Sequence, residues 1–313
     1  MKPEEFLRDL QAKPDHLRAL SVEGSWEWLE RPPGRIVLLG MGSSHYANAV
    51  AAARLRTAGL DAVAELASSD LLPRPRPDDL VLAVSASAGS AETLDAVERI
   101  RGAGATSVVA VANREGALTG LAERTVWMEA GEERGGVACR SFQHTLALLL
   151  ELERHLTGGR AVPLAEVAAA SEHLLDTEGT WRPRLDELLL GPSGTHVVAP
   201  ARRLSSAQQS TLMLREGPRL PAVGCETGDW SHVDVYLTKT TDYRMLLLAG
   251  SPWEPQLIDW TTQRGSTVVA LGGTVPGATQ ELRYPHDEDD DVRLLTETLV
   301  CELVAARAWV AQG

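Results

Sequence analysis

Short apolar runs alternate with longer amphipathic segments along most of the chain. Runs of this kind predict buried strands, whereas segments with apolar residues three or four positions apart predict helices. In the first half of the chain, the predicted strands are residues 36–39, 62–66, 81–84, 107–112 and 125–128, and the predicted helices are residues 44–58, 91–102 and 141–155. Strands that alternate with helices imply right-handed crossovers, so we expect a mostly parallel sheet with helices on both faces.

The second half of the chain repeats this pattern. Residues 195–215 predict a strand, a turn and a helix, and residues 244–273 predict a strand, a helix and another strand. Because the offset between the copies is about 160 residues throughout, we expect two three-layer α/β/α domains related by a pseudo-duplication. The expected division is a helical segment at 1–33, a first domain at 34–160, a linking helix at 161–190 and a second domain at 191–313.

Two serine-rich turns follow predicted strands of the first copy. The first contains Gly42, Ser43 and Ser44, and the second contains Ser85, Ser87 and Ser90. Each turn leads into a predicted helix, whose unpaired N–H groups and positive dipole end favour a bound phosphate. Serine is also a common helix N-cap. One cap requires one serine, however, so three hydroxyls in six residues favour a phosphate ligand.

The second copy differs at the corresponding turns. Its counterpart of the three-serine turn runs from Gly250 to Trp253, and the bulky indole is a poor neighbour for a phosphate. At its other turn, we interpret Arg202 and Arg203 as part of an exposed turn rather than as an anion site. We therefore place the phosphate site in the first copy.

The amino-acid composition excludes several classes of protein for this chain. The net charge is −13, which argues against nucleic acid or an anionic membrane as a partner. The three cysteines are far apart and lack metal-site spacing, which indicates reduced thiols and no metal. The acidic, polar start is unlike a signal peptide, and no apolar run is long enough to span a bilayer. We expect a cytoplasmic protein that requires no cofactor.

Two further motifs have competing interpretations. Gly40 and Gly42, with Glu65 after the next strand, suggest a dinucleotide site, but His45 stands where that fingerprint has its third glycine. We interpret His45 as a surface residue, although it adjoins the first serines. The acidic run at 287–291 follows a histidine, and we interpret it as a solvated loop rather than a metal site.

Four motifs, taken together, resemble the double SIS (sugar isomerase) family, which includes the isomerase domain of glucosamine-6-phosphate synthase and related phosphosugar isomerases and deglycases. The family's turn Gly-Ser-Ser is matched at 42–44, and its Ser-Gln-Ser-Gly-Glu-Thr turn is matched in part at 85–93. A third motif matches at Glu133, Arg140 and Phe142. The fourth pairs Glu216 at the end of a helix with His232 in the loop after Gly228.

The resemblance implies SIS-type, flavodoxin-like domains and a role for each matched residue. The residues implied to hold a sugar phosphate are Gly42, Ser43, Ser44, Ser85, Ser87, Ser90 and Ala138. Glu216 would move a proton between C1 and C2, and His232 would assist ring opening. In the family this histidine reaches the site from the neighbouring subunit, so the resemblance implies a homodimer or a tetramer built from dimers.

The chain also departs from the family pattern. Ala86 replaces a phosphate-binding glutamine, and Gln209 and Met213 stand where the synthase has an acid and a lysine. Ala138 and Cys139 replace a Ser-Thr pair, and the printed sequence contains neither the synthase's tail lysine nor its glutaminase unit. We therefore do not expect glutamine-dependent amidotransfer.

Two functions remain open after these comparisons of motifs. The first is an aldose–ketose isomerase, deglycase or deaminase acting on a hexose or hexosamine 6-phosphate. This function needs Glu216, whose place at a helix C-terminus is electrostatically unfavourable for a carboxylate, and it also needs His232. The second is a non-catalytic sugar-phosphate sensor, which needs only the serines. We favour the enzyme.

Overall fold

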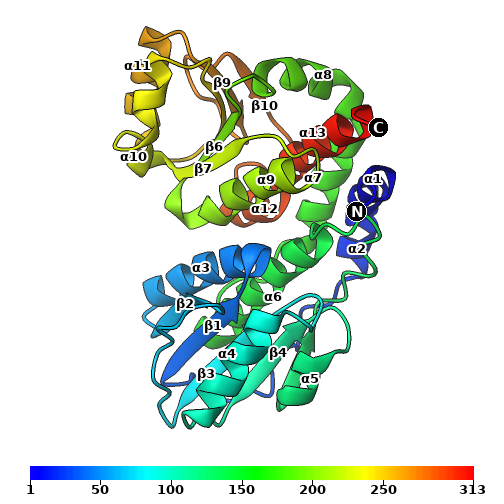
Figure 1. Cartoon of the computed structure of the whole chain (residues 1–313), viewed down its shortest axis with the longest axis vertical. Helices are drawn as coiled ribbons and strands as arrows, with labels where there is room; N and C mark the ends of the chain where they lie inside the picture. The colour runs from blue at the N-terminus through cyan, green and yellow to red at the C-terminus, as the bar shows by residue number, and fades with distance from the viewer. The chain divides into compact units, whose positions relative to one another are not determined.

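The computed structural model describes residues 1–313 and divides into two compact units (Figure 1). The N-terminal unit consists of Ala19–Glu132 and Arg140–Val162. The C-terminal unit consists of Met1–Arg18, Glu133–Cys139 and Pro163–Gly313. Each unit is built around its own five-stranded sheet.

The sheet of the N-terminal unit is entirely parallel and has the order β2-β1-β3-β4-β5. Its strands are β1 (Arg35–Gly40), β2 (Ala62–Leu66), β3 (Asp79–Val84), β4 (Val108–Ala112) and β5 (Arg124–Trp127). Its helices are α3 (Gly42–Thr57), α4 (Ala91–Gly102), α5 (Ala117–Leu121) and α6 (Arg140–Thr157). Helices α3 and α6 lie on one face and α4 and α5 on the other (Figure 1), so β1, β3 and β4 are buried along their whole length.

The sheet of the C-terminal unit is also parallel and has the order β10-β9-β8-β6-β7. Its strands are β6 (Thr195–Ala199), β7 (Ala222–Glu226), β8 (Arg244–Leu248), β9 (Thr267–Leu271) and β10 (Gln280–Leu282). Numbered within each sheet, both orders read 2-1-3-4-5, the flavodoxin-like order. The α/β class and the parallel sheets predicted from the sequence are confirmed.

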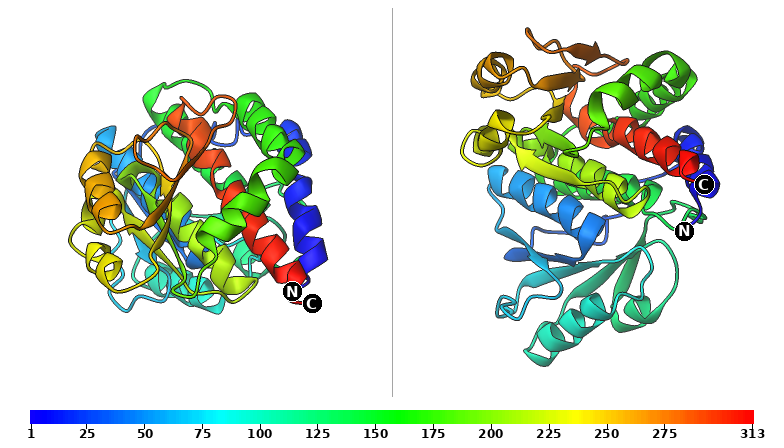
Figure 2. Two further views of the ribbon diagram at one scale, coloured as in Figure 1. Left: turned by 90° about the horizontal axis from the view of Figure 1, so that it is seen from above. Right: turned by 45° about the horizontal axis from the view of Figure 1, so that its top comes forward.

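Helices from both ends of the chain complete the C-terminal unit. Its α-helices are α1 (Pro3–Gln11), α2 (Lys13–Ala19, whose last residue falls in the other unit), α7 (Leu164–Asp176), α8 (Glu178–Leu189), α9 (Leu204–Glu216), α10 (Thr227–Trp230), α11 (Glu254–Gln263), α12 (Asp290–Thr296) and α13 (Thr298–Ala311). Two short 3₁₀ helices are η1 (Ala201–Arg203) and η2 (Asp234–Lys239). Helix α1 lies beside α13 (Figure 2). No helix has both the length and the apolar composition that crossing a bilayer requires.

The helical expectations need two corrections. The single helix expected from about Pro163 is instead two helices, α7 and α8, which meet at Thr177. Pro183, inside α8, offers no N–H to the carbonyl of Gly179, so the first turns of α8 lack one helical hydrogen bond. Near the N-terminus, helix stops at Ala19, and the stretch from 20 to 33 forms turns rather than helix.

Candidate functional site

The two serine turns begin at neighbouring positions on one edge of the N-terminal sheet. Strands β1 and β3 pair in parallel, with Leu39 opposite Ala83, so their carboxyl ends lie side by side. From β1 the chain crosses to β2 on one side, and from β3 it crosses to β4 on the other. The gap between β1 and β3 is therefore a topological switch point, where open α/β sheets bind their ligands.

The first turn leaves the start of α3 without a side-chain cap. The helix begins at Gly42, two residues earlier than predicted, and Met41 at its N-cap offers no side-chain hydrogen bond. Gly42 has φ = +49°, a left-handed conformation that favours glycine. Ser43 and Ser44 therefore lie in the first helical turn, half-buried, and neither hydroxyl has a hydrogen-bond partner in the protein.

The second turn uses its three hydroxyls differently. The Ser85 hydroxyl lies 3.4 Å from that of Ser87, which accepts a 3.2 Å bond from the Gly89 N–H. Ser90 is the N-cap of α4, where it accepts from the Thr93 N–H and donates to the Glu92 carboxylate. The capping interpretation of serine thus holds for Ser90, whereas Ser85 and Ser87 serve no helix cap.

Two polar residues lie behind the first turn. His45, expected at the surface, is half-buried, and this burial lowers the pKa of its imidazole. Its Nδ1 is enclosed without a hydrogen-bond partner, as are both amide atoms of the fully buried Asn48. Gly40 permits this packing, because a Cβ there would lie 2.9 Å from both Asn48 Nδ2 and Ser44 Cβ. The sequence signal for Asn48, which we missed, was a polar residue one helical turn after Ser44 in an alanine-rich helix.

The candidate base, Glu216, is the last residue of α9 in the C-terminal unit. It is half-buried, and burial raises the pKa of its carboxyl group. The nearby carboxylate of Glu133 raises that pKa further. Glu133 is itself held in place, because it accepts a 2.7 Å hydrogen bond from the Cys139 N–H. A carboxyl group with a raised pKa, paired with a second carboxylate, is typical of acid–base sites.

The segment that contains Ala138 is held against α9. The fully buried Gln209 donates a 2.7 Å hydrogen bond from Nε2 to the Ala138 carbonyl oxygen. The other amide atom of Gln209, Oε1, is buried without a partner. In this unit, α9 therefore fixes the backbone at Ala138 and also ends in Glu216.

His232 lies at the surface of the C-terminal unit, just after α10. A buried network anchors the segment around it: the Trp230 indole N–H donates to Tyr243 Oη at 2.8 Å, and Tyr243 donates to the Asp234 carboxylate at 3.1 Å. His196 Nδ1 lies 3.0 Å from the same carboxylate and its ring stacks on Tyr243. His232 is thus exposed on a segment that the buried side chains of Trp230 and Asp234 hold in place.

The predicted site residues are divided between the two units. The N-terminal unit contains Gly42 and all five serines, and the C-terminal unit contains Ala138, Glu216 and His232.

The turn at Gly250, after β8, differs from the three-serine turn of the N-terminal unit. The N–H groups of Gly250 and Ser251 both donate to the Glu254 carboxylate, so these amides already hold an anion. The prediction that Arg202 and Arg203 lie in an exposed turn is wrong for Arg203. Its guanidinium is 1% exposed, pairs with the buried Glu297 and donates to the Ala249 carbonyl.

The acidic run also differs from expectation. Asp287 is buried and accepts from Arg283, Asp289 caps α12, and Asp290 pairs with Arg202. These carboxylates are structural, and for Asp290 the partner, Arg202, comes from a distant segment that the sequence alone does not indicate. No group of three or more histidine, cysteine or acidic side chains is arranged to hold a metal ion.

Comparison with known proteins agrees with this fold and these motifs. Residues 31–152 match the SIS domain family. A glutamine–fructose-6-phosphate aminotransferase of Aeropyrum pernix is 30% identical over 222 residues, which cover 66% of this chain and 36% of the relative. The chain thus spans about a third of the length of the curated relatives it matches.

Solved structures show the same fold across almost the whole chain. The C-terminal domain of glucosamine-fructose-6-phosphate aminotransferase from Francisella tularensis superposes with a TM-score of 0.83 at 15% identity, covering 99% of this chain and 96% of that one. Tagatose-6-phosphate ketose/aldose isomerase from Escherichia coli gives 0.79 at 16% identity, covering 99% of this chain and 93% of that one. The chain thus shares its fold with these proteins, and its residues 31–152 match the SIS domain family.

Proposed function

We propose that the chain binds a hexose or hexosamine 6-phosphate and interconverts its aldose and ketose forms. The observation that carries this proposal is the pair of serine turns at the switch point between β1 and β3. The uncapped start of α3, together with the hydroxyls of Ser43 and Ser85, offers a phosphate several hydrogen bonds. With a net charge of −13, the protein would hold an anion by such local donors rather than by a basic surface.

In this proposal, Glu216 is the group that moves the proton. Its carboxylate takes the proton from C2 of the open-chain aldose, and the electron pair shifts onto the carbonyl oxygen O1 to give an enediolate. The same carboxyl group then returns the proton to C1 while the hydroxyl proton of O2 passes to O1, which yields the ketose. The raised pKa of Glu216 suits both steps, because a base that is too weak would not accept the proton. Release of ammonia from a hexosamine 6-phosphate, as in a deaminase, would begin with the corresponding proton transfer.

We further propose that two copies of the chain associate through the surface around His232. Apolar side chains that are unusually exposed gather on the neighbouring segments, namely Val233, Tyr236, Leu237, Trp253 and Trp260. These segments are in contact, since Arg264, the residue that follows α11, donates a hydrogen bond to the Val235 carbonyl in η2. Burial of this surface by a second copy would place His232 at the interface, where it would assist ring opening in the neighbour's site.

Calorimetry with glucose 6-phosphate and glucose tests the phosphate site. We expect the phosphate ester to bind and glucose to bind far more weakly, and we expect S85A/S87A to lose at least tenfold in affinity, since hydrogen bonds to charged groups contribute about 1.5–3 kcal/mol each. Equal affinity for the two sugars would refute the site. Binding without deuterium exchange at C2 in D₂O would instead identify a sugar-phosphate sensor.

A further inference from the structure

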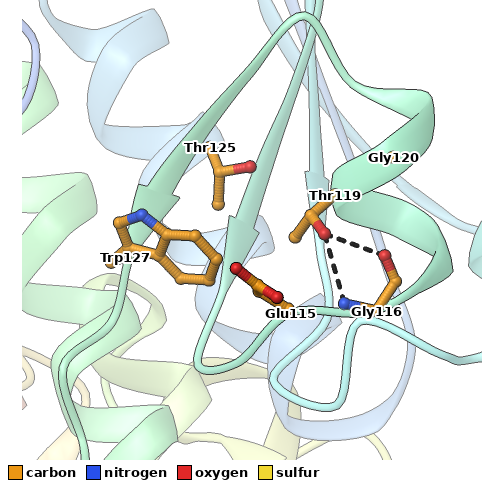
Figure 3. Close-up of a pocket in the computed structure, with 6 residues that line it drawn as sticks. All are labelled: Glu115, Gly116, Thr119, Gly120, Thr125 and Trp127. Atoms are coloured by element: carbon orange, nitrogen blue, oxygen red, sulfur yellow. Dashed lines mark hydrogen bonds between the residues drawn. The ribbon is translucent and has the colours of Figure 1, made fainter.

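A hollow in the N-terminal unit is lined by none of the predicted site residues. It has a volume of about 590 Å³ and lies between α5 and β5 (Figure 3). Its walls are formed by Glu115, Gly116, Thr119, Gly120, Thr125 and Trp127. Thr125 and Trp127 are two positions apart on β5, so their side chains lie on the same face of the sheet.

The walls combine an aromatic ring with an unpaired carboxylate. The Glu115 side chain projects into the space between the Trp127 indole and Thr119 (Figure 3). It is exposed and forms no hydrogen bond or ion pair in the protein. Trp127 is 41% exposed, although tryptophan is usually well buried.

The nearest cation along the strand does not serve this pocket. Arg124 alternates to the opposite face of β5, where its guanidinium lies 5.3 Å from the ring centroid of Trp28. Arg114, which precedes Glu115 in the sequence, donates to the Ser87 carbonyl instead. Glu115 and Trp127 are therefore left without a positive partner, although both attract one. An anion would be repelled by Glu115, and a neutral molecule would gain nothing from its charge.

We propose that this pocket binds the primary ammonium group of a small organic molecule. The ammonium would lie between the Glu115 carboxylate and the face of the Trp127 indole, and the Thr125 hydroxyl would accept one of its hydrogens. Because the contacts are partly exposed, the binding is weak, with a dissociation constant of about 1–10 mM.

The pocket also adjoins the back of the second serine turn. The Leu118 N–H donates a 3.0 Å hydrogen bond to the Ala88 carbonyl, and a Cβ on Gly116 would lie 2.7 Å from that same oxygen. The pocket and the serine turn nevertheless present different side chains. Loss of the Ser85 and Ser87 hydroxyls therefore leaves the ammonium site intact, which separates this proposal from the phosphosugar site.

NMR titration of the whole chain tests the proposal, with the Trp127 indole N–H signal assigned by its absence in W127F. The probes are n-propylamine (ammonium alone), glucosamine (ammonium on a sugar ring) and glucose (ring alone). We expect saturable shifts with glucosamine and none with glucose. If n-propylamine also shifts the signal, the ammonium group alone is sufficient for binding. If only glucosamine shifts it, the ligand is an amino sugar.

Matched variants test the role of each wall. We expect E115Q to weaken binding about fivefold and W127L about threefold, and E123Q, the same charge change at an exposed residue outside the pocket, to have no effect. We also expect S85A/S87A to bind glucosamine like the parent. The proposal would be overturned if glucose bound with the same affinity as glucosamine or if no probe gave saturable binding. Equal effects of E115Q and E123Q on the affinity would also overturn it.

Discussion

Glu216 shows how a single position acquires chemistry from its surroundings. A carboxylate at a helix C-terminus is already disfavoured by the helix dipole, and burial and the carboxylate of Glu133 add to that effect. All three influences favour the protonated form, so the group holds its proton at a higher pH than an ordinary glutamate. Such a group is better suited than an ordinary glutamate to exchange a proton with a substrate.

Replacement of Glu216 by Gln preserves shape and hydrogen bonding but removes the base. We expect C2 deuterium exchange to fall by about 10²–10⁴-fold, while the calorimetric affinity for the sugar phosphate stays within about twofold of the parent's. E166Q, at an exposed residue of α7, is the control and should exchange at the parental rate. Unchanged exchange in E216Q would show that another group is the base.

The effect of Glu133 on the pKa of Glu216 allows a separate test, through the pH dependence of the reaction rate. Glu216 must be ionised to accept a proton, so the rate falls on the acidic side as pH drops through its pKa. The charge of Glu133 raises that pKa, and E133Q removes the charge. We therefore expect the acidic limb of the pH–rate profile to move to lower pH in E133Q. A limb that stays in place or moves to higher pH contradicts the assigned pair.

At the scale of elements, the start of α3 depends on how closely it approaches β1. Gly40 ends the strand, and Ser44 and Asn48 of the helix lie directly over it. The elements themselves follow from apolar periodicity, so α4 was predicted with its observed bounds. Helix α13 was not predicted, because its apolar residues are spread around the helix and form no amphipathic stripe.

Gly40→Ala tests this close approach. The added methyl would lie 2.9 Å from Ser44 Cβ and 3.2 Å from the His45 backbone nitrogen, so we expect a loss of about 1–3 kcal/mol in the free energy of unfolding and weaker binding of phosphate. Gly102→Ala is the control, because a Cβ there contacts nothing within 4 Å and alanine favours helix. Chemical denaturation measures both variants. Equal free energies of unfolding for the two variants would show that the contact between Gly40 and α3 has room for a methyl group.

What the sequence could not show are contacts between distant segments. The motifs predicted the serines and Glu216 as site residues, since each lies at the end of a recognisable strand or helix, and predicted His232 through its spacing from Glu216. By contrast, the buried pair of Arg203 and Glu297 joins residues 94 positions apart, and no local pattern indicates such a partner. The effect of Glu133 on Glu216 was hidden for the same reason.

At the scale of the whole molecule, the proposed dimer makes each site depend on two chains. Equal mixing of E216Q and H232A gives about half mixed dimers, each with one complete site, so we expect about a quarter of the parental activity. Each variant alone should be inactive or nearly so, which is the control. A dimer by light scattering whose mixtures recover no activity would refute the shared site. An active monomer would refute the dimer as well.

The Glu254 carboxylate, which occupies the amide groups of Gly250 and Ser251, has a consequence for how the C-terminal unit can evolve. It acts as a competitor tethered to its own binding site, where a short tether gives an effective concentration in the millimolar range or above. A free phosphate ester at a lower concentration displaces it only if its affinity for these amides is correspondingly higher. The turn is therefore shielded from most free anions, and the surface of the C-terminal unit can diverge without competing for the ligand proposed for the N-terminal unit.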